Sequence, residues 1–412
     1  MTILFIFLIL ENILERFISI LNYSDEIITV LALFALGAHF LRESTIKITK
    51  YNFRLFLCFL AILTIGIIAT MRFSMQKEVI AVVKDILAIS KFYIIYLFGV
   101  ICLNKGIPQK QLKQISLFSK VYTLILFICG CINLIADIGM SIGIRNGIRS
   151  YVFLYSHETF LVSTVVIMMA VLIVDNFNKN KVFIAIGFIV LGFTLRSKSI
   201  IFILAVIVLE YIVRNNEFSK LKKFFSMKTK IKLILAFSFI IAVTFFFVKD
   251  KLSLYISFGL TAARPALYIT SLKILADFFP LGSGFGTFAS YISGRYYSPL
   301  YSQYGIQYVN GLDNVSGYAY ISDTYWPYII AQFGLFGSII YLYSLFLILK
   351  NILKMYNQKR ESFIAALSVY IYMIGACFVE SLLTNANIVI IALSLSYYLN
   401  LLQEYKVNQI EI

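Results

Sequence analysis

The sequence is dominated by long apolar runs that are separated by short clusters of charged residues. Each run has roughly 15 to 25 residues, and about 20 helical residues cross the ~30 Å hydrocarbon core of a bilayer. Hydrophobic residues make up 60% of the 412 residues and charged residues 14%, whereas soluble domains are about half apolar and about a quarter charged. The chain is therefore predicted to be an all-α polytopic membrane protein.

The apolar runs predict about twelve transmembrane helices. They lie near residues 2–21, 27–41, 54–70, 85–103, 121–139, 158–174, 182–195, 199–213, 233–248, 323–349, 362–383 and 386–402. Residues 1–248 then hold the first nine helices, residues 249–322 form one long external loop, and residues 323–412 hold the last three. Glu11 and Arg16 interrupt the first run, so we expect a retained first helix and not a cleaved signal peptide.

The basic residues alternate from loop to loop and predict the orientation. Loops 42–54, 104–120 and 350–360 each carry four Lys or Arg residues, and loop 214–232 carries seven, whereas the short loops 22–26, 71–84, 140–157 and 196–198 on the opposite side carry none to three. Basic loops stay in the cytoplasm, so both termini are expected there, and the long loop is expected on the outer face. The net charge of +16 is thus explained by topology, and no nucleic-acid partner is predicted.

The long loop opens with "TAARPALYITSLKILADFF", which predicts an interfacial helix near 262–279. Thr261 can cap this helix, and Pro265 suits its first turn. Its apolar face is formed by Leu267, Ile274, Leu275 and Phe278. Arg264 lies at the N-terminus, where free N–H groups and the helix dipole favour an anion such as phosphate. The alternative is an arginine that only holds lipid headgroups.

A glycine-rich stretch, "FPLGSGFGTF", follows this helix and carries Gly282, Gly284 and Gly286. Glycine-rich loops often cradle phosphate, but a nucleotide-binding loop ends in Gly-Lys-Ser or Gly-Lys-Thr, and this one does not. A loop on the outer face also has no access to cytoplasmic ATP. We therefore predict that the stretch does not bind a nucleotide.

A second cationic feature is the turn "LRSKS", with Arg196 and Lys198, between the short spans 182–195 and 199–213. Spans of this length place the turn within hydrocarbon depth, where charged groups usually line a polar cavity or have a partner. Glu158, at the start of another span, is the expected partner. The alternative is that both cations extend to lipid headgroups.

Together these features predict an outward-facing anionic site formed by Arg196, Lys198 and Arg264, with Arg149 from the same side. The acidic residues are scattered along the sequence and the two histidines are far apart, so no metal site is predicted. Catalysis by cationic stabilisation of a phosphate leaving group is therefore favoured over metal-assisted hydrolysis.

A tyrosine-rich stretch closes the long loop. Its aromatic residues are Tyr291, Tyr296, Tyr297, Tyr301, Tyr304, Tyr308, Tyr318, Tyr320, Tyr325 and Trp326. Such residues gather at membrane interfaces, and they can also form a cap over a sugar, because aromatic rings stack on C–H surfaces. Both interpretations stay open. Arg295 lies within this stretch and is a further candidate contact for a substrate.

Three segments, in their order and spacing, resemble the O-antigen polymerase and ligase superfamily. They read "LRSKSIIFILAV", "RPALYITSLKILADFFPLGSGFGTF" and "SDTYWPYIIAQFGLFGSIIYL". Many ligases carry a histidine ahead of an asparagine where this chain has Asp323-Thr324-Tyr325-Trp326, which is closer to the Asp-x-x-Trp-Pro pattern of repeat-unit polymerases. The family's Ser-Arg turn reads Ser197-Lys198 here, so the resemblance leaves open which cation takes the arginine's place.

The resemblance implies a bacterial inner-membrane glycosyltransferase that joins undecaprenyl-diphosphate-linked oligosaccharide repeats on the outer face. Donor and acceptor are then both lipid-linked, membrane lipid surrounds the enzyme, a chain-length regulator protein is a further expected partner, and no cofactor is needed. Arg264 with Arg196 or Lys198 would stabilise the leaving diphosphate. Asp323, or alternatively Glu158, would accept the proton, although Asp323 can also simply cap the helix that follows.

The same resemblance implies further contacts to substrate. The glycine turn would let the backbone approach the lipid diphosphate closely. The expected substrate-binding residues are Arg149, Glu158, Gly282, Gly284, Gly286, Arg295, Tyr325 and Trp326. A ligase with another acceptor is the first alternative, and a lipid-linked glycan transporter is the second, although the two halves of the chain show no sequence repeat.

Overall fold

The computed structural model describes residues 2–43, 47–103, 108–145, 147–214, 253, 257–313, 315–357, 359–400 and 409–411. Helices dominate this part of the chain, and its sheets are two antiparallel pairs of short strands. The predicted ninth helix near 233–248 and nearly all of the basic loop 214–232 lie outside the described residues.

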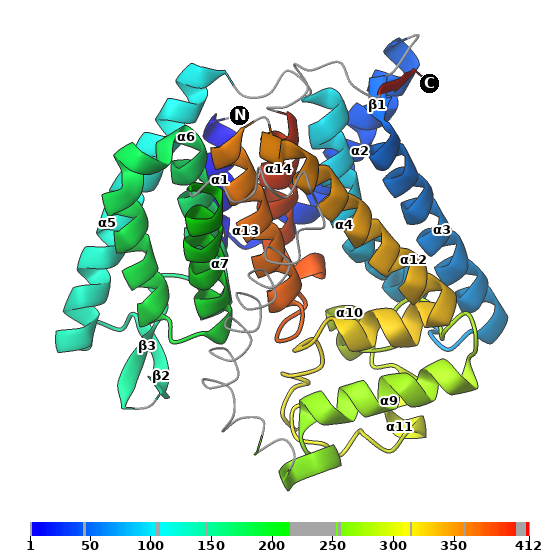
Figure 1. Ribbon diagram of the computed structural model, residues 1–412. Helices are drawn as coiled ribbons and strands as arrows, with labels where there is room; N and C mark the ends of the chain where they lie inside the picture. Colours follow the sequence, from blue (N-terminus) through cyan, green and yellow to red (C-terminus); the bar gives the residue numbers. More distant parts are fainter. Residues whose placement is uncertain are drawn as a thin grey trace, which may run out of the picture.

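The longer elements follow one another along the chain and form a bundle (Figure 1). They are α1 (Thr2–Glu15), α2 (Ser24–Arg42), α3 (Lys50–Phe73), α4 (Val79–Cys102), α5 (Gln109–Ile135), α6 (Glu158–Phe193), α7 (Ser197–Arg214), α9 (Ala263–Asp277), α12 (Trp326–Lys354), α13 (Arg360–Ala376) and α14 (Asn387–Asn400). The short elements are η1 (Ser19–Tyr23), β1 (Lys47–Thr49), β2 (Ser141–Arg145), β3 (Ile148–Tyr151), η3 (Gly259–Thr261), α10 (Tyr291–Arg295), α11 (Pro299–Gln303), η4 (Met355–Asn357), η5 (Leu382–Thr384) and β4 (Gln409–Glu411).

Helices α13 and α14 occupy the middle of the bundle. α13 packs on α6 and α7, α14 packs on α4, and α12 packs on α3. In Figure 1, α5, α6 and α7 lie on one side of this centre, and α2, α3, α4 and α12 lie on the other. Every residue of α14 is buried, which is why its sequence is apolar all round and not only on one face.

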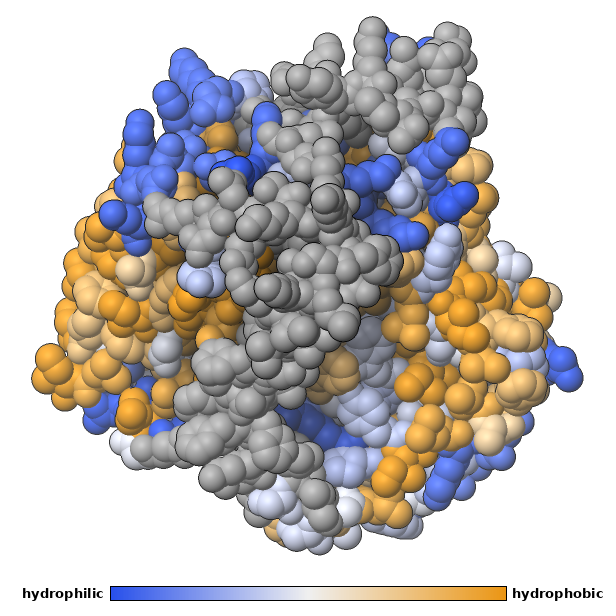
Figure 2. Space-filling model, in the orientation of Figure 1, coloured by the Kyte–Doolittle hydropathy of each residue, from blue (hydrophilic) through white to orange (hydrophobic). Residues whose placement is uncertain are grey.

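The helices have the length and composition of a membrane protein. Within the described residues, six are long and apolar enough to cross a bilayer: α2 with the preceding η1 turn, α3, α4, α5, α6 and α12. Figure 2 shows hydrophobic side chains as a band across both flanks, with hydrophilic ones at both ends. The all-α membrane prediction is therefore confirmed.

The count of twelve spans is not supported by the same criteria. α1 and α13 have 14 and 17 residues, and α7 carries Lys198, Glu210 and Arg214 within its 18 residues. The predicted spans 158–174 and 182–195, in contrast, correspond to the two parts of α6, which breaks at Asn176 (φ −174°, ψ 109°) and folds back, since Arg196 after its end lies 2.8 Å from Glu158 at its start. The side-chain oxygen of Asn176 accepts the N–H of Lys179 at 2.9 Å, and thereby caps the second part.

The long loop forms a small layer at one end of the bundle. Figure 1 shows α9, α10, α11 and the β2–β3 hairpin at this end, which we call the loop end, whereas the start of α1 and strand β4 lie at the opposite end. The two terminal elements are thus on the same side of the bundle. Which end faces the cytoplasm stays a prediction.

Helix α9 forms where the sequence predicts a helix, although its start differs in detail. Ala262 is the N-cap without any side-chain cap bond, and the Thr261 hydroxyl instead donates to the Phe258 carbonyl at 2.7 Å. The prediction that Thr261 caps the helix is therefore wrong. The predicted apolar face is largely buried, mainly against α12: Leu267, Ile274 and Phe278 are buried and Leu275 is partly buried.

Candidate functional site

Arg264 and Asp323 form an ion pair at the loop end of the bundle. Arg264 lies in the first turn of α9, and its Nη2 is 3.1 Å from Oδ2 of Asp323, which precedes α12. The side chains are 24% and 35% exposed. Helix α12 has Tyr325 as N-cap, with no side-chain cap bond. The alternative role for Asp323, a helix cap, is therefore wrong.

Arg196 and Glu158 form a second ion pair, as the sequence predicts. Leu195 takes a positive φ of 51° between α6 and α7, and Arg196 follows it. The Arg196 Nη2 lies 2.8 Å from Oε2 of Glu158, the fully buried first residue of α6. The other oxygen, Oε1, accepts from the Ser150 hydroxyl at 3.0 Å and lies 3.7 Å from Nη2 of Arg145.

His157 connects the start of α6 to this second pair. Its Nδ1 accepts the N–H of Thr159 at 3.2 Å, so the ring caps α6. Its Nε2 lies 3.3 Å from Nη2 of Arg196 and 3.4 Å from the Glu158 carboxylate. Burial is the largest cause that lowers the pKa of His157, and Arg196 adds to this effect while Glu158 opposes it. The folded protein therefore favours the neutral imidazole.

Lys198 and Glu380 form a third and more deeply buried pair. Nζ of Lys198 is 2.5 Å from Oε2 of Glu380, and the two side chains are only 3% and 10% exposed. Within the described residues, the other oxygen of Glu380, Oε1, is buried without a hydrogen-bond partner. Sequence reasoning missed Glu380. The available signal was an acidic residue inside the apolar run 362–383, which by itself indicates a functional position.

The turn that carries Glu380 joins the other parts of the site. The N–H of Tyr325 donates to the Cys377 carbonyl at 3.0 Å, and the Ser381 hydroxyl donates to the Ser322 carbonyl at 2.7 Å. Nη2 of Arg264 also lies 3.5 Å from the Val379 carbonyl oxygen. The turn after α13, the segment before α12 and the start of α9 are therefore held together.

The three pairs are close enough to influence one another. Burial raises the pKa of Asp323, and Arg264 is the largest opposing influence, with Arg196 lowering it further and Glu380 raising it. We call the whole group the polar cluster. Its members are Arg145, His157, Glu158, Arg196, Lys198, Arg264, Asp323 and Glu380. With His157 neutral, four cations face three carboxylates, so the net charge of the cluster is one positive.

The glycine stretch lies outside this cluster and forms a buried contact, which we call the joint, between the long loop and α12. Gly282, Gly284 and Gly286 all have positive φ, between 70° and 88°. The N–H groups of Ser283 and Gly284 donate to the Ala331 and Gln332 carbonyls in α12 at 2.9 and 3.0 Å. The stretch is therefore docked on α12, where Gly334 breaks the helix with φ 61° and ψ −158°.

Three further N–H groups of the glycine stretch are also occupied. Phe285 donates to the Thr70 hydroxyl at 2.8 Å, and Gly286 donates to the buried carboxylate of Asp85 at 2.8 Å. The N–H of Gly282 donates to the Phe278 carbonyl. Five successive N–H groups, from Gly282 to Gly286, are thus bonded within the protein. The expectation that this turn approaches a lipid diphosphate is corrected: it holds the long loop against the bundle.

Four other predicted residues stay apart from the polar cluster. Arg149 faces the Asn133 carbonyl at 3.4 Å and the Asp137 carboxylate at 3.7 Å, and it is Arg145, which was not predicted, that lies beside Glu158. The other three predicted residues are either exposed or packed inside the fold. Arg295 is exposed at the end of α10, Tyr325 is buried and donates to the Tyr341 hydroxyl, and the ring of Trp326 packs on that of Phe378.

Part of the tyrosine-rich stretch packs on itself and does not form an open face. Tyr301 is fully buried, and its ring stacks on Phe288 at 5.4 Å and on Tyr297 at 5.0 Å. The Tyr301 hydroxyl accepts the N–H of Ala289 at 2.9 Å. Tyr308, in contrast, is 85% exposed. The hypothesis of a tyrosine cap over a sugar therefore depends on the outer members of the stretch, such as Tyr291 and Tyr308.

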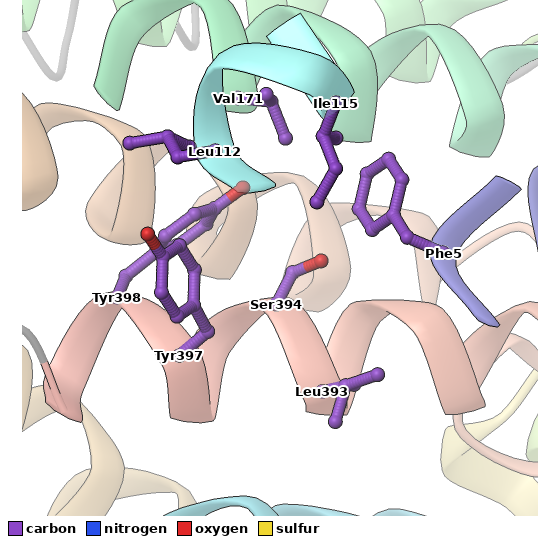
Figure 3. Close-up of a pocket in the computed structure, with 8 residues that line it drawn as sticks. All are labelled: Phe5, Leu112, Ile115, Val171, Leu393, Ser394, Tyr397 and Tyr398. Atoms are coloured by element: carbon purple, nitrogen blue, oxygen red, sulfur yellow. The ribbon is translucent and has the colours of Figure 1, made fainter. Parts of the chain in front are cut away.

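A small apolar cavity elsewhere has none of the chemistry of the polar cluster. It lies between α1, α5, α6 and α14, as Figure 3 shows. Its lining residues are Phe5, Leu112, Ile115, Val171, Leu393, Ser394, Tyr397 and Tyr398. No charged side chain lines it. The described residues also contain no group of three or more His, Cys, Asp or Glu side chains that could hold a metal ion.

Comparison with known proteins adds no relative to this picture, because neither a protein-family model nor a curated protein matches the chain.

Proposed function

We propose that the protein is a polymerase that joins undecaprenyl-diphosphate-linked oligosaccharide repeats into a surface polysaccharide. The observation that carries this proposal is the polar cluster, in which Arg264, Arg196 and Lys198 gather beside carboxylates at one end of an apolar bundle. Guanidinium and ammonium groups in a partly desolvated site stabilise a phosphate leaving group. The resemblance of three sequence segments to O-antigen polymerases supports the same assignment.

In the proposed reaction, a hydroxyl of the acceptor's terminal sugar attacks the anomeric carbon of the donor glycan. The bond between that carbon and the phosphate oxygen breaks, and the diphosphate departs with the electron pair. Arg264, Arg196 and Lys198 offset the charge that develops on the diphosphate. The Asp323 carboxylate accepts the proton of the attacking hydroxyl. Departure of the diphosphate drives the transfer, so neither ATP nor a cofactor takes part.

The proposal includes a location and a topology. The chain crosses the bacterial inner membrane about twelve times, with the loop end of the bundle on the outer face and both termini in the cytoplasm. The basic loops 42–54, 104–120 and 350–360 support this orientation. It places the polar cluster where lipid-linked repeats are available after they have crossed the membrane.

The test is complementation of a deletion strain, followed by sizing of the surface glycan on a gel. Wild type and Arg149→Ala should both produce a ladder, because Arg149 lies outside the polar cluster. Arg264→Ala should yield only single repeats, at protein levels matched by immunoblot. A full ladder from Arg264→Ala would contradict the proposal. Glycan that accumulates on the cytoplasmic side in the deletion strain would favour a transporter instead.

A further inference from the structure

Each cation that the proposed reaction needs is bonded to a carboxylate in the structure. Arg264 is paired with Asp323, Arg196 with Glu158, and Lys198 with Glu380. Because the polar cluster has a net charge of only about one positive, an arriving diphosphate meets carboxylates as well as cations. An anion therefore binds tightly to one of these cations only after the carboxylate paired with that cation has moved away.

The Arg264–Asp323 pair is the one that a ligand can open most easily. It is the most exposed of the three, with 24% and 35% of the side chains accessible. Glu158 is fully buried, and the Ser150 hydroxyl bonds to it in addition to Arg196. The Lys198–Glu380 pair is also nearly enclosed. Separation of a buried pair leaves an uncompensated charge and costs more than separation of an exposed one.

The surroundings of this pair let the Asp323 side chain turn away while Arg264 stays in place. The backbone of Asp323 is held, because its N–H donates to the Tyr320 carbonyl at 3.2 Å, but its side chain is 35% exposed and does not cap the following helix. Arg264 belongs to a regular helix, and the Val379 carbonyl lies 3.5 Å from its Nη2. Loss of Asp323 therefore leaves the guanidinium oriented towards the same space.

We infer that the donor's diphosphate displaces Asp323 from Arg264, and that the released carboxylate then serves as the base. This inference rests on the proposed function. The guanidinium exchanges one anion for another, so no charge is left unpaired. Once Arg264 binds the diphosphate, its positive charge no longer stabilises the ionised form of Asp323. The carboxylate therefore becomes a stronger base. Proton abstraction is thereby coupled to the presence of the donor.

The test is a binding measurement with undecaprenyl diphosphate on the full chain in nanodiscs. Asp323→Asn removes the competing charge and should bind this lipid about fivefold to tenfold more tightly than wild type. Arg264→Ala should bind it at least about tenfold more weakly. Asp277→Asn makes the same change at the far end of α9, where Asp277 accepts from Tyr304, and should match wild type. Asp323→Glu keeps the charge and should restore the weaker affinity.

The outcomes separate this inference from the proposed function. If wild type binds the lipid diphosphate and Asp323→Asn binds it equally or more weakly, with an unchanged melting temperature, the displacement is refuted and the polymerase proposal stands. If the wild-type protein shows no binding of the lipid diphosphate, the proposed function itself fails. Tighter binding by Asp277→Asn as well would mean that only the overall charge matters, which would also overturn the displacement.

Discussion

Gly282 and Gly334 face each other across the joint between the long loop and α12. A Cβ atom on Gly282 would lie 2.4 Å from the backbone nitrogen of Gly334, and a Cβ on Gly334 would lie 2.4 Å from the nitrogen of Gly282. Both residues also have a positive φ. The backbones therefore touch here without side chains between them, and this contact sets the position of the α9 layer on the bundle.

The first prediction concerns this contact. Gly282→Ala should lower the free energy of unfolding by about 2–4 kcal/mol, because the methyl group adds overpacking of about 1–3 kcal/mol to the cost of a positive φ. Gly305→Ala is the control, because Gly305 has a φ of 70° but no heavy atom within 4 Å of the place that a Cβ atom would take. Thermal unfolding in detergent measures both. Equal losses would show that only the backbone conformation matters.

The second prediction concerns the buried pair of Lys198 and Glu380. Lys198→Ala should cost about 3–5 kcal/mol, since it leaves the Glu380 carboxylate buried without its cation. The double variant Lys198→Met with Glu380→Gln should lose less than the single variant. Arg149→Ala is the control and should cost at most about 1 kcal/mol, because its pair with Asp137 is long and exposed. A double variant less stable than Lys198→Ala would contradict this account.

The third prediction concerns pH and His157. The folded pKa of His157 is lowered from 6.5, so the folded state binds fewer protons than the unfolded chain. The stability from the neutral ring is fully present above about pH 6.5 and is lost as the pH falls through the lowered pKa. His157→Asn keeps a good N-cap residue that does not titrate. Melting temperatures from pH 8 to 5 should fall more steeply for wild type than for this variant, and parallel curves would refute the prediction.

The fourth prediction separates the two kinds of tyrosine in the long loop. Tyr301→Ala should cost about 3–5 kcal/mol, because it empties a buried site between Phe288 and Tyr297. Tyr301→Phe should cost about 1–2 kcal/mol, through the lost bond to the Ala289 N–H. Tyr308→Ala should change stability by less than about 0.5 kcal/mol. If Tyr308→Ala proved as costly as Tyr301→Ala, the inner and outer tyrosines would not differ as the structure indicates.

Local patterns were sufficient for the class of fold and for one pairing in the site. The apolar runs predict a helical membrane protein because a helix is the structure that satisfies its own backbone hydrogen bonds in lipid. The pair of Arg196 and Glu158 was also predicted, since both are charged residues next to apolar spans on the same side. Helix ends were less predictable, as Thr261 shows, whereas the break at Asn176 falls between the predicted spans 158–174 and 182–195.

Long-range contacts decided the rest of the site. Arg264 and Asp323 are 59 positions apart, and Lys198 and Glu380 are 182 positions apart, so periodicity cannot bring them together. The glycine stretch shows the same limit. Its spacing is typical of a phosphate loop, but the N–H groups of a glycine turn bind whichever acceptors the fold supplies, and here these come from α3, α4 and α12.

The sequence by itself thus determined that this chain is an all-α membrane protein, because the apolar length needed to cross a bilayer is a local property. It also marked Arg196, Lys198 and Arg264 as charges that need partners. Only the tertiary structure decided which carboxylate neutralises each of them and which glycines are buried in a joint. Those contacts depend on how α6, α9, α12 and α13 pack against one another, and packing joins residues whatever their separation in the chain.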